Sequence, residues 1–181
     1  MTAEEYAATP EDAEHHIELQ EGALLVAARP VPDHQDIMLE LAVQLRPQVP
    51  EHLKLLVEVD IDLCLVPPAD PGTIRSPDLV VVTKEAFLRV RKRGGLLRAS
   101  DTVLAIEIHS ASTRRTDTMI KRNEYADAGI NHYWMIDPFN GPSLTACHLA
   151  GDLGYGGPGP VRGTFTTQTP FPTHLDLDTL G

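Results

Sequence analysis

The sequence predicts an α/β protein with a mixed β-sheet flanked by helices. Short apolar or alternating segments, typical of strands, are interleaved along the chain with amphipathic segments typical of helices. Clusters of glycine and proline separate these segments, and neither an internal repeat nor a long linker divides them. A chain of 181 residues is long enough for one substantial core, so we expect residues 1–181 to form a single domain.

The N-terminal part is expected to contain a hairpin, a helix and a strand. Residues 16–28 alternate and then become apolar around a central Glu-Gly pair, a pattern typical of a β-hairpin. In residues 35–49 apolar side chains recur at every fourth position from Ile37, which predicts an amphipathic helix that ends near Pro47. Residues 53–66 alternate apolar and acidic side chains, so we expect one half-exposed strand there.

The middle of the chain is expected to hold two buried strands. The proline-rich residues 67–72 break the preceding strand, and "SPDLVVVT" (76–83) reads as a short strand buried on both faces. Residues 84–100 are basic and contain glycine, so we expect a mobile excursion from the fold. "TVLAIEIH" (102–109) is the next buried strand.

A helix and further strands complete the prediction. Residues 113–129 should form the helix, with Ser112 or Thr113 as N-cap and Gly129 in the left-handed conformation that ends it. The remaining segments predict strands at 132–138, 144–149 and 164–168, a turn-rich connector at 151–163 and a short acidic tail.

The charge of the chain is strongly uneven. The net charge is −11, which argues against a general affinity for nucleic acid. Residues 84–122, however, contain ten basic and four acidic residues, a local charge of +6 against −17 for the rest. An acidic body with one basic zone suits a charged partner that approaches from one side, although an ordinary solvated basic loop would give the same pattern.

Nothing in the composition indicates export or a membrane span. No apolar run reaches about 18 residues, and the acidic N-terminal segment lacks the apolar stretch of a signal peptide. The two cysteines have neither metal-binding spacing nor a disulfide framework. We therefore expect a cytoplasmic protein without a membrane partner.

Two acids in neighbouring predicted strands are candidates for a metal site. Glu107 lies inside an apolar strand and shares one strand face with Ala105 and His109, while Asp78 begins the preceding buried strand. Two buried carboxylates brought together repel each other unless a proton or a divalent cation lies between them. Alternatively, Asp78 is an ordinary turn residue, and an arginine from the 114–115 pair neutralises Glu107.

The following helix offers a lysine to the same site. Asp117, Lys121 and Tyr125 recur at every fourth position and therefore share one helix face. On an isolated helix this pattern would be a surface ion pair of little energetic value. Many metal-dependent phosphodiesterases carry a lysine two residues after the strand glutamate, where this chain has His109. Because the helix starts shortly after Glu107, Lys121 could supply that lysine instead.

Taken together in order and spacing, these pieces resemble a known family. The segments "SPDLVVV" and "VLAIEIHSASTRRTDTMIKRNEYADAGINHYWMIDP" are similar to the Uma-type (Uma-two) restriction endonucleases, a branch of the PD-(D/E)XK nuclease superfamily. The likeness continues upstream in "IELQEGALL" and "PDHQDIMLELAVQL", so it covers most of the chain. It implies a restriction-endonuclease-like core, a mixed sheet flanked by helices and preceded by the N-terminal hairpin and helix.

The resemblance also implies roles for individual residues. Asp78 and Glu107 would be catalytic metal-binding acids, the carbonyl of Ile108 a third ligand, and Lys121 the catalytic lysine. His109 departs from the family pattern, which commonly has an apolar residue there. The supporting residues of the site would be Asp117, Tyr125, His109, Glu18, His34 and Glu40.

The implied activity is hydrolysis of DNA phosphodiester bonds by a water activated by Mg²⁺, with Mn²⁺ as a substitute. The backbone of the DNA would be held by Arg91, Lys92, Arg93, Arg114 and Arg115. Two alternatives stay open: a catalytically inactive nucleic-acid-binding or assembly protein on the same fold, and a small-molecule or metal-binding protein of another class. A homodimer would bring two sites to one duplex, but the sequence itself carries no sign of one.

Overall fold

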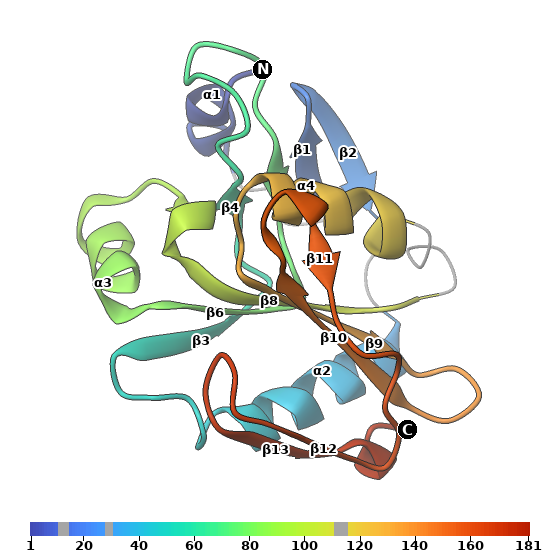
Figure 1. The fold of residues 1–181 in the computed structure, drawn as a ribbon. Coiled ribbons are helices and arrows are strands. Elements are labelled where there is room, and N and C mark those ends of the chain that lie inside the picture. Colours follow the sequence, from blue (N-terminus) through green and yellow to red (C-terminus); the bar gives the residue numbers. More distant parts are fainter. Residues whose placement is uncertain (11–14, 28–30, 111–115) are drawn as a thin grey trace.

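Two mixed β-sheets, packed with helices, make up most of the fold (Figure 1). The computed structural model describes residues 1–10, 15–27, 31–110 and 116–181. The larger sheet has the order β11-β10-β9-β8-β6-β3, the smaller has the order β2-β1-β5-β4-β7, and β12 pairs with β13. The strands are β1 (His16–Gln20), β2 (Ala23–Ala27), β3 (Leu53–Val57), β4 (Ile61–Asp62), β5 (Ile74–Arg75), β6 (Leu79–Thr83), β7 (Leu97–Arg98), β8 (Thr102–Ile108), β9 (His132–Asp137), β10 (Ser143–Leu149), β11 (Tyr155–Gly156), β12 (Thr164–Thr167) and β13 (Thr173–Asp176).

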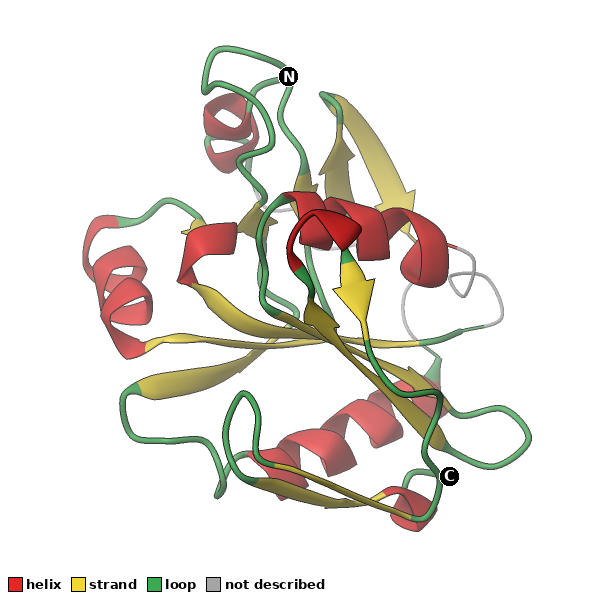
Figure 2. Ribbon diagram, in the orientation of Figure 1, coloured by secondary structure: helices red, strands yellow, loops and turns green. Residues whose placement is uncertain are grey.

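Helices cover both faces of the larger sheet (Figure 2). The helix α2 and the β12–β13 hairpin lie against one face, and α4 with the smaller sheet lies against the other (Figures 1 and 2). The α-helices are α1 (Ala3–Ala7), α2 (Pro32–Leu45), α3 (Lys84–Arg93) and α4 (Arg122–Asp127). A π-helix, η2 (Thr116–Lys121), precedes α4, and short 3₁₀ turns are η1 (Ala99–Asp101), η3 (Gly151–Leu153) and η4 (Leu177–Thr179).

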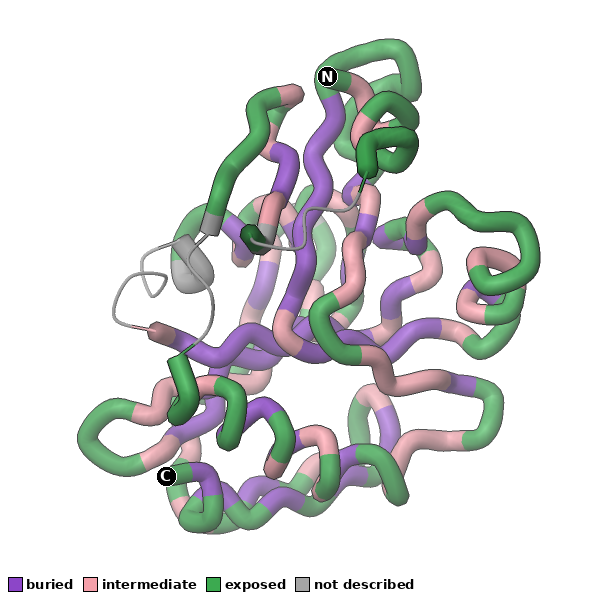
Figure 3. The backbone as a smooth tube through the Cα atoms, turned by 180° about the vertical axis from the view of Figure 1, so that it is seen from behind, coloured by how far each residue is buried: buried purple, intermediate pink, exposed green. Residues whose placement is uncertain are grey.

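The central strands are buried because both of their faces pack against a core. In β6, Leu79 and Val81 belong to the core shared with α2, whereas Val80 and Val82 belong to the core shared with α4. All four side chains are fully buried, as expected for the predicted continuous apolar run. Seen from behind, the buried backbone follows these central strands (Figure 3). The strands predicted at 76–83 and 102–109 are therefore confirmed.

The predicted hairpin is also confirmed. Strands β1 and β2 pair in antiparallel register, and the two turn residues Glu21 and Gly22 have φ angles of 48° and 81°. Two successive positive φ angles are the signature of a tight hairpin turn. Gly22 is needed for a second reason, because a Cβ atom there would lie 2.7 Å from the Cβ of Pro71.

Two parallel strands are joined by a segment that contains two helices. Strands β8 and β9 run parallel, and η2 and α4 lie on the segment that joins them. The helix ends as predicted before Gly129, whose φ of 76° is left-handed. The single α-helix predicted over 113–129 is wrong in detail, since its described part begins as a π-helix. The predicted N-cap, Ser112 or Thr113, lies outside the described residues.

The single strand predicted over 53–66 is wrong. Glu58 has a φ of 47°, which turns the chain from β3 in the larger sheet to β4 in the smaller one. The backbone N–H of Glu58 donates to the carbonyl oxygen of Asp78, and Asp60 accepts a hydrogen bond from the hydroxyl of Tyr6. These contacts with distant segments fix the bend, although the apolar alternation continues through it.

The mobile excursion predicted over 84–100 is wrong as well. Thr83 caps α3 by accepting a hydrogen bond from the N–H of Ala86, whose side chain is buried. Arg89 then forms two hydrogen bonds with Asp101, which fastens the helix to the start of β8. A tertiary contact therefore orders a segment whose composition suggested a loop.

The predicted acidic tail is folded too. Its residues 173–179 form β13 and η4, and Leu175 and Leu177 are fully buried in the core that includes α2. Side chains of α2 bind this hairpin directly, since Gln44 and Gln48 each hydrogen-bond the backbone of β13. Within the described part of the chain, no helix is long and apolar enough to cross a membrane.

Candidate active site

The structure brings Asp78 and Glu107 together across two neighbouring strands. Strands β6 and β8 are antiparallel, with Leu79 opposite Ile106 and Val80 opposite Ala105. The next pair in this register is Asp78 and Glu107, whose Cβ atoms are then about 5 Å apart and on the same face. The register therefore has the two acids at neighbouring positions near the end of the most buried strands.

Lys121 reaches Glu107 from the following helix, as predicted. Its Nζ lies 2.9 Å from Oε1 of Glu107 and 3.0 Å from Oε1 of Glu18. The hydroxyl of Tyr125, one helical turn later, donates to the same Oε1 of Glu107 at 2.8 Å. Burial and the charge of Glu107 raise the pKa of Tyr125 well above its ordinary value, so the phenol keeps its proton and acts as a donor.

Further charged side chains, beyond Lys121, hold Glu18 in place. The guanidinium of Arg75, which is fully buried, donates to Glu18 at 2.9 Å and to both oxygens of Glu124 at 2.7 and 2.8 Å. The same guanidinium donates to Gln20, and the backbone N–H of Ser76 donates to Glu18. Neither Arg75 nor Glu124 was predicted from the sequence to be a site residue.

The charges of this site fit a divalent cation. Four of its described side chains are carboxylates and two are permanent cations, which leaves an excess of two negative charges before His34, the partner of Asp78, is counted; they are Glu18, Asp78, Glu107, Glu124, Arg75 and Lys121. Carboxylate and carbonyl oxygens are the ligands that Mg²⁺ prefers. Among the described residues, however, no group of three or more His, Cys, Asp or Glu side chains is placed to hold a metal. A cation here would need a backbone oxygen as well.

His34 completes the geometry around Asp78. Its Nε2 lies 3.3 Å from Oδ1 of Asp78 and 3.2 Å from the carbonyl oxygen of Ile108, while the N–H of Ile108 donates to Oδ2 of Asp78 at 2.6 Å. The hydrogen bond with Asp78 has the largest effect and raises the pKa of His34 above its ordinary value, against the opposite effect of burial. Asp78, Ile108 and His34 thus form one hydrogen-bonded group.

The other predicted supporting residues are placed differently. His109 is buried beside Ile108, and its backbone N–H donates to the carbonyl oxygen of Ile136. Glu40 accepts a hydrogen bond from Gln44, the residue that binds β13. Among the described residues, no hydrogen bond or ion pair joins Glu40 to Asp78 or Glu107, so its role stays a prediction. Asp117 lies in η2, but its side chain is outside what the structure describes.

Comparison with family models identifies the family of this chain. A family model described as "Uma2: Putative restriction endonuclease" matches residues 3–159. The chain belongs to the Uma2 family. The resemblance found in the sequence is therefore confirmed.

A solved structure has the same fold as this Uma2 chain. The crystal structure of "a putative nuclease belonging to DUF820" from Anabaena variabilis ATCC 29413 has a TM-score of 0.68 and 17% sequence identity, and the match covers 99% of this chain and 97% of that chain. This likeness confirms the predicted mixed α/β fold. A comparison with curated proteins gave no match.

Arg91 of the basic segment of the Uma2 chain borders a hollow whose lining residues do not include Asp78, Glu107 or Lys121. This hollow, of about 800 Å³, is lined by Arg91 from α3 and by Glu58 and Ser76, which are close in sequence or in space to Asp78. Arg91 and Lys92 are exposed at the end of α3, whereas the predicted Arg114 and Arg115 lie outside the described residues.

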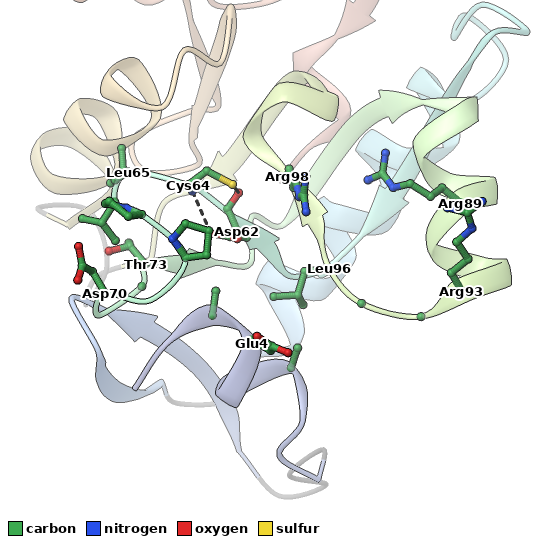
Figure 4. A pocket seen from close by; sticks show the side chains of 18 residues that line it. Glu4, Asp62, Cys64, Leu65, Asp70, Thr73, Arg89, Arg93, Leu96 and Arg98 are labelled. Atoms are coloured by element: carbon green, nitrogen blue, oxygen red, sulfur yellow. Dashed lines mark hydrogen bonds between the residues drawn. The ribbon is translucent and has the colours of Figure 1, made fainter.

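A second hollow, of about 530 Å³, belongs to a different part of the surface (Figure 4). Arg93 and Arg98 line it opposite Asp62 and Cys64. None of Asp78, Glu107 and Lys121 is among its lining residues. Its charges are mixed, and it lies apart from the acids, so we do not include it in the candidate site.

The ion network around Glu18 predicts a loss of stability in acid. Burial alone would raise the pKa of Glu18, but Lys121 and Arg75, with the N–H of Ser76, lower it below its ordinary value. A lowered pKa contributes stability that is complete above the unfolded-state value, about 4.5, and is lost as the pH falls through the folded-state value.

We expect the free energy of unfolding to fall more steeply between pH 5 and 3 in the wild type than in Glu18→Gln, with both measured by urea unfolding at a series of pH values. Glu51→Gln, at an exposed turn, is the matched control and should follow the wild type. Parallel pH profiles for all three proteins would contradict this prediction.

Proposed function

We propose that this chain is a metal-dependent endonuclease that hydrolyses phosphodiester bonds of DNA. The observation that supports the proposal is the ion pair between Lys121 and Glu107 near the end of β8, where the register of β6 and β8, continued by one residue, has Asp78 opposite Glu107. Membership of a family whose description is "Putative restriction endonuclease" agrees with it. The proposed cofactor is Mg²⁺, with Mn²⁺ as a substitute.

Asp78, Glu107 and the carbonyl of Ile108 would hold the cation. When bound, it would lower the pKa of a coordinated water and neutralise charge on the scissile phosphate. Hard oxygen ligands and the excess negative charge of the site suit this role.

The protein's own residues would then act around the phosphate. The ammonium of Lys121 lies among carboxylates and could turn to orient the attacking water or to stabilise the charge that develops on phosphate oxygens. Tyr125 would keep Glu107 oriented through its hydrogen bond. The exposed Arg91, Lys92 and Arg93 would bind the DNA backbone without reading bases.

One observation favours a second function, a catalytically inactive nucleic-acid-binding or assembly protein. Lys121 and Tyr125 already donate hydrogen bonds to Oε1 of Glu107 within the protein, so the carboxylate is paired without a metal ion. A purely structural network would have the same hydrogen bonds.

Calorimetric titration of Mn²⁺ and Mg²⁺ separates the two functions. A nuclease should bind the cation saturably, and both Asp78→Asn and Glu107→Gln should abolish the binding while remaining folded. The same two variants should lose cleavage of plasmid DNA. The matched control is Asp62→Asn, because Asp62 lies on the second hollow away from the site. Equal heats in all four proteins, with and without duplex DNA, would rule out the metal-dependent mechanism and favour the inactive alternative.

A further inference from the structure

His34 lies where two oxygen atoms of the proposed cation site converge. Its Nε2 is 3.2 Å from the carbonyl oxygen of Ile108 and 3.3 Å from Oδ1 of Asp78. A carbonyl and an ionised carboxylate are both acceptors, so Nε2 carries a proton that faces both of them. Two oxygen acceptors from separate segments, the start of β6 and the end of β8, therefore face one ring nitrogen of α2.

The separations between these atoms are close to those of neighbouring ligands on a metal. An octahedral cation with bonds of about 2.1 Å holds adjacent ligand atoms about 3.0 Å apart. The distances from His34 to the two oxygens exceed this spacing by only about 0.2 to 0.3 Å. A small contraction would therefore be enough to replace the proton by a cation.

The position of His34 is fixed by the helix that carries it. It lies in the first turn of α2, a helix anchored in the core by Ile37 and Leu41. Its side chain is only 11% exposed, so rotation into solvent is restricted. Glu58 adds a further negative charge that acts on the ring.

We infer that Nε2 of His34 is a direct ligand of the cation, beside Oδ1 of Asp78 and the carbonyl oxygen of Ile108. This inference rests on the proposed function, because it concerns the same cation site. To free the Nε2 lone pair for the cation, a ring protonated on both nitrogens would release its Nε2 proton to solvent, whereas a neutral ring would carry its single proton on Nδ1 instead of Nε2. Within the described part of the chain, Nδ1 of His34 is buried without a hydrogen-bond partner.

A nitrogen ligand also changes which cation the site selects. Mg²⁺ is bound almost entirely by oxygen, whereas imidazole is a good ligand for first-row transition-metal ions. Nitrogen ligation by His34 would therefore strengthen the binding of Mn²⁺, the proposed substitute ion, more than the binding of Mg²⁺.

Pulsed electron paramagnetic resonance of the Mn²⁺-bound wild-type protein tests the ligand directly. We expect a nitrogen coupling on Mn²⁺ that changes when the protein is labelled with ¹⁵N-histidine, and this readout needs no variant. In calorimetry, His34→Ala should weaken Mn²⁺ binding by about tenfold or more and should affect Mg²⁺ binding less. His52→Ala, at an exposed turn before β3, should keep both the coupling and the affinity.

The outcomes separate this inference from the proposed function. If Mn²⁺ binds and Asp78→Asn abolishes the binding, but no nitrogen coupling is seen and His34→Ala binds equally or more tightly, His34 is not a ligand and only this inference fails. If the wild type binds no Mn²⁺, even with duplex DNA present, the proposed function fails together with it.

Discussion

Replacing Lys121 by methionine is expected to lower the rate of DNA cleavage about 100- to 1,000-fold, the usual loss when one preorganised donor is removed from a developing charge. Methionine has a similar length and no charge, so the buried position stays filled. Cation binding should survive, and it should become tighter. Without the ammonium, Glu107 and Glu18 lose the cation that they share at 2.9 and 3.0 Å, and their mutual repulsion favours a metal ion.

The combination of slower cleavage with retained Mn²⁺ binding is what distinguishes a catalytic lysine from a structural one. Single-turnover cleavage of a plasmid and calorimetry on the same samples would measure both quantities. Lys84→Met, at the exposed start of α3, is the matched control and should leave both unchanged. Cleavage by Lys121→Met at the wild-type rate would remove Lys121 from the mechanism.

Local signals were sufficient to predict the parts of the fold on which the site depends. The strands that carry Asp78 and Glu107 are continuous apolar runs, and the hairpin has a Glu-Gly turn. These elements are determined by neighbours in the sequence, so pattern and turn chemistry identify them. Lys121 and Tyr125 follow from helical spacing, with the resemblance to the family pointing to their roles.

The errors arose where distant contacts decide the conformation. The alternation through Glu58 predicts a straight strand, but hydrogen bonds with Asp78 and between Tyr6 and Asp60 turn the chain into another sheet. Residues 84–93 of the basic segment form the helix α3, because its buried face and the Arg89–Asp101 pair attach it to the core. The basic composition of this segment indicates that its side chains prefer solvent, but it does not show which distant residues they contact.

Arg75 was missed for a related reason. It lies in β5, a strand of only two residues, where no periodicity can indicate that the side chain points inward. Its partners Glu18 and Glu124 are 57 and 49 residues away in the sequence. The one local clue is an arginine next to Ile74 directly before the "SPD" segment, and that clue alone does not identify a buried ion network.

Replacing Arg75 by methionine is expected to lower the free energy of unfolding by about 3 to 5 kcal/mol, because it leaves the partly buried Glu124 without its counter-charge and the buried Glu18 with Lys121 alone. The guanidinium is fully buried and satisfies both oxygens of Glu124 and one of Glu18, which a smaller cation cannot do at once. Urea unfolding at pH 7 measures the change. Arg89→Ala is the control: this arginine also pairs with a carboxylate, Asp101, but it is 39% exposed and should cost about 1 kcal/mol or less.

The loss of stability in Arg75→Met should come mainly from the carboxylate charge left without a partner, and not from lost packing. Adding Glu124→Gln to Arg75→Met removes one of the stranded charges, so the double variant should be more stable than Arg75→Met alone. In the wild-type background the same Glu124→Gln change should be destabilising, since it removes a partner of the buried guanidinium. The decisive result is that the stability change caused by Glu124→Gln has opposite signs in the wild type and in Arg75→Met. If the stability losses of the two substitutions simply add, Arg75 stabilises the protein by filling space.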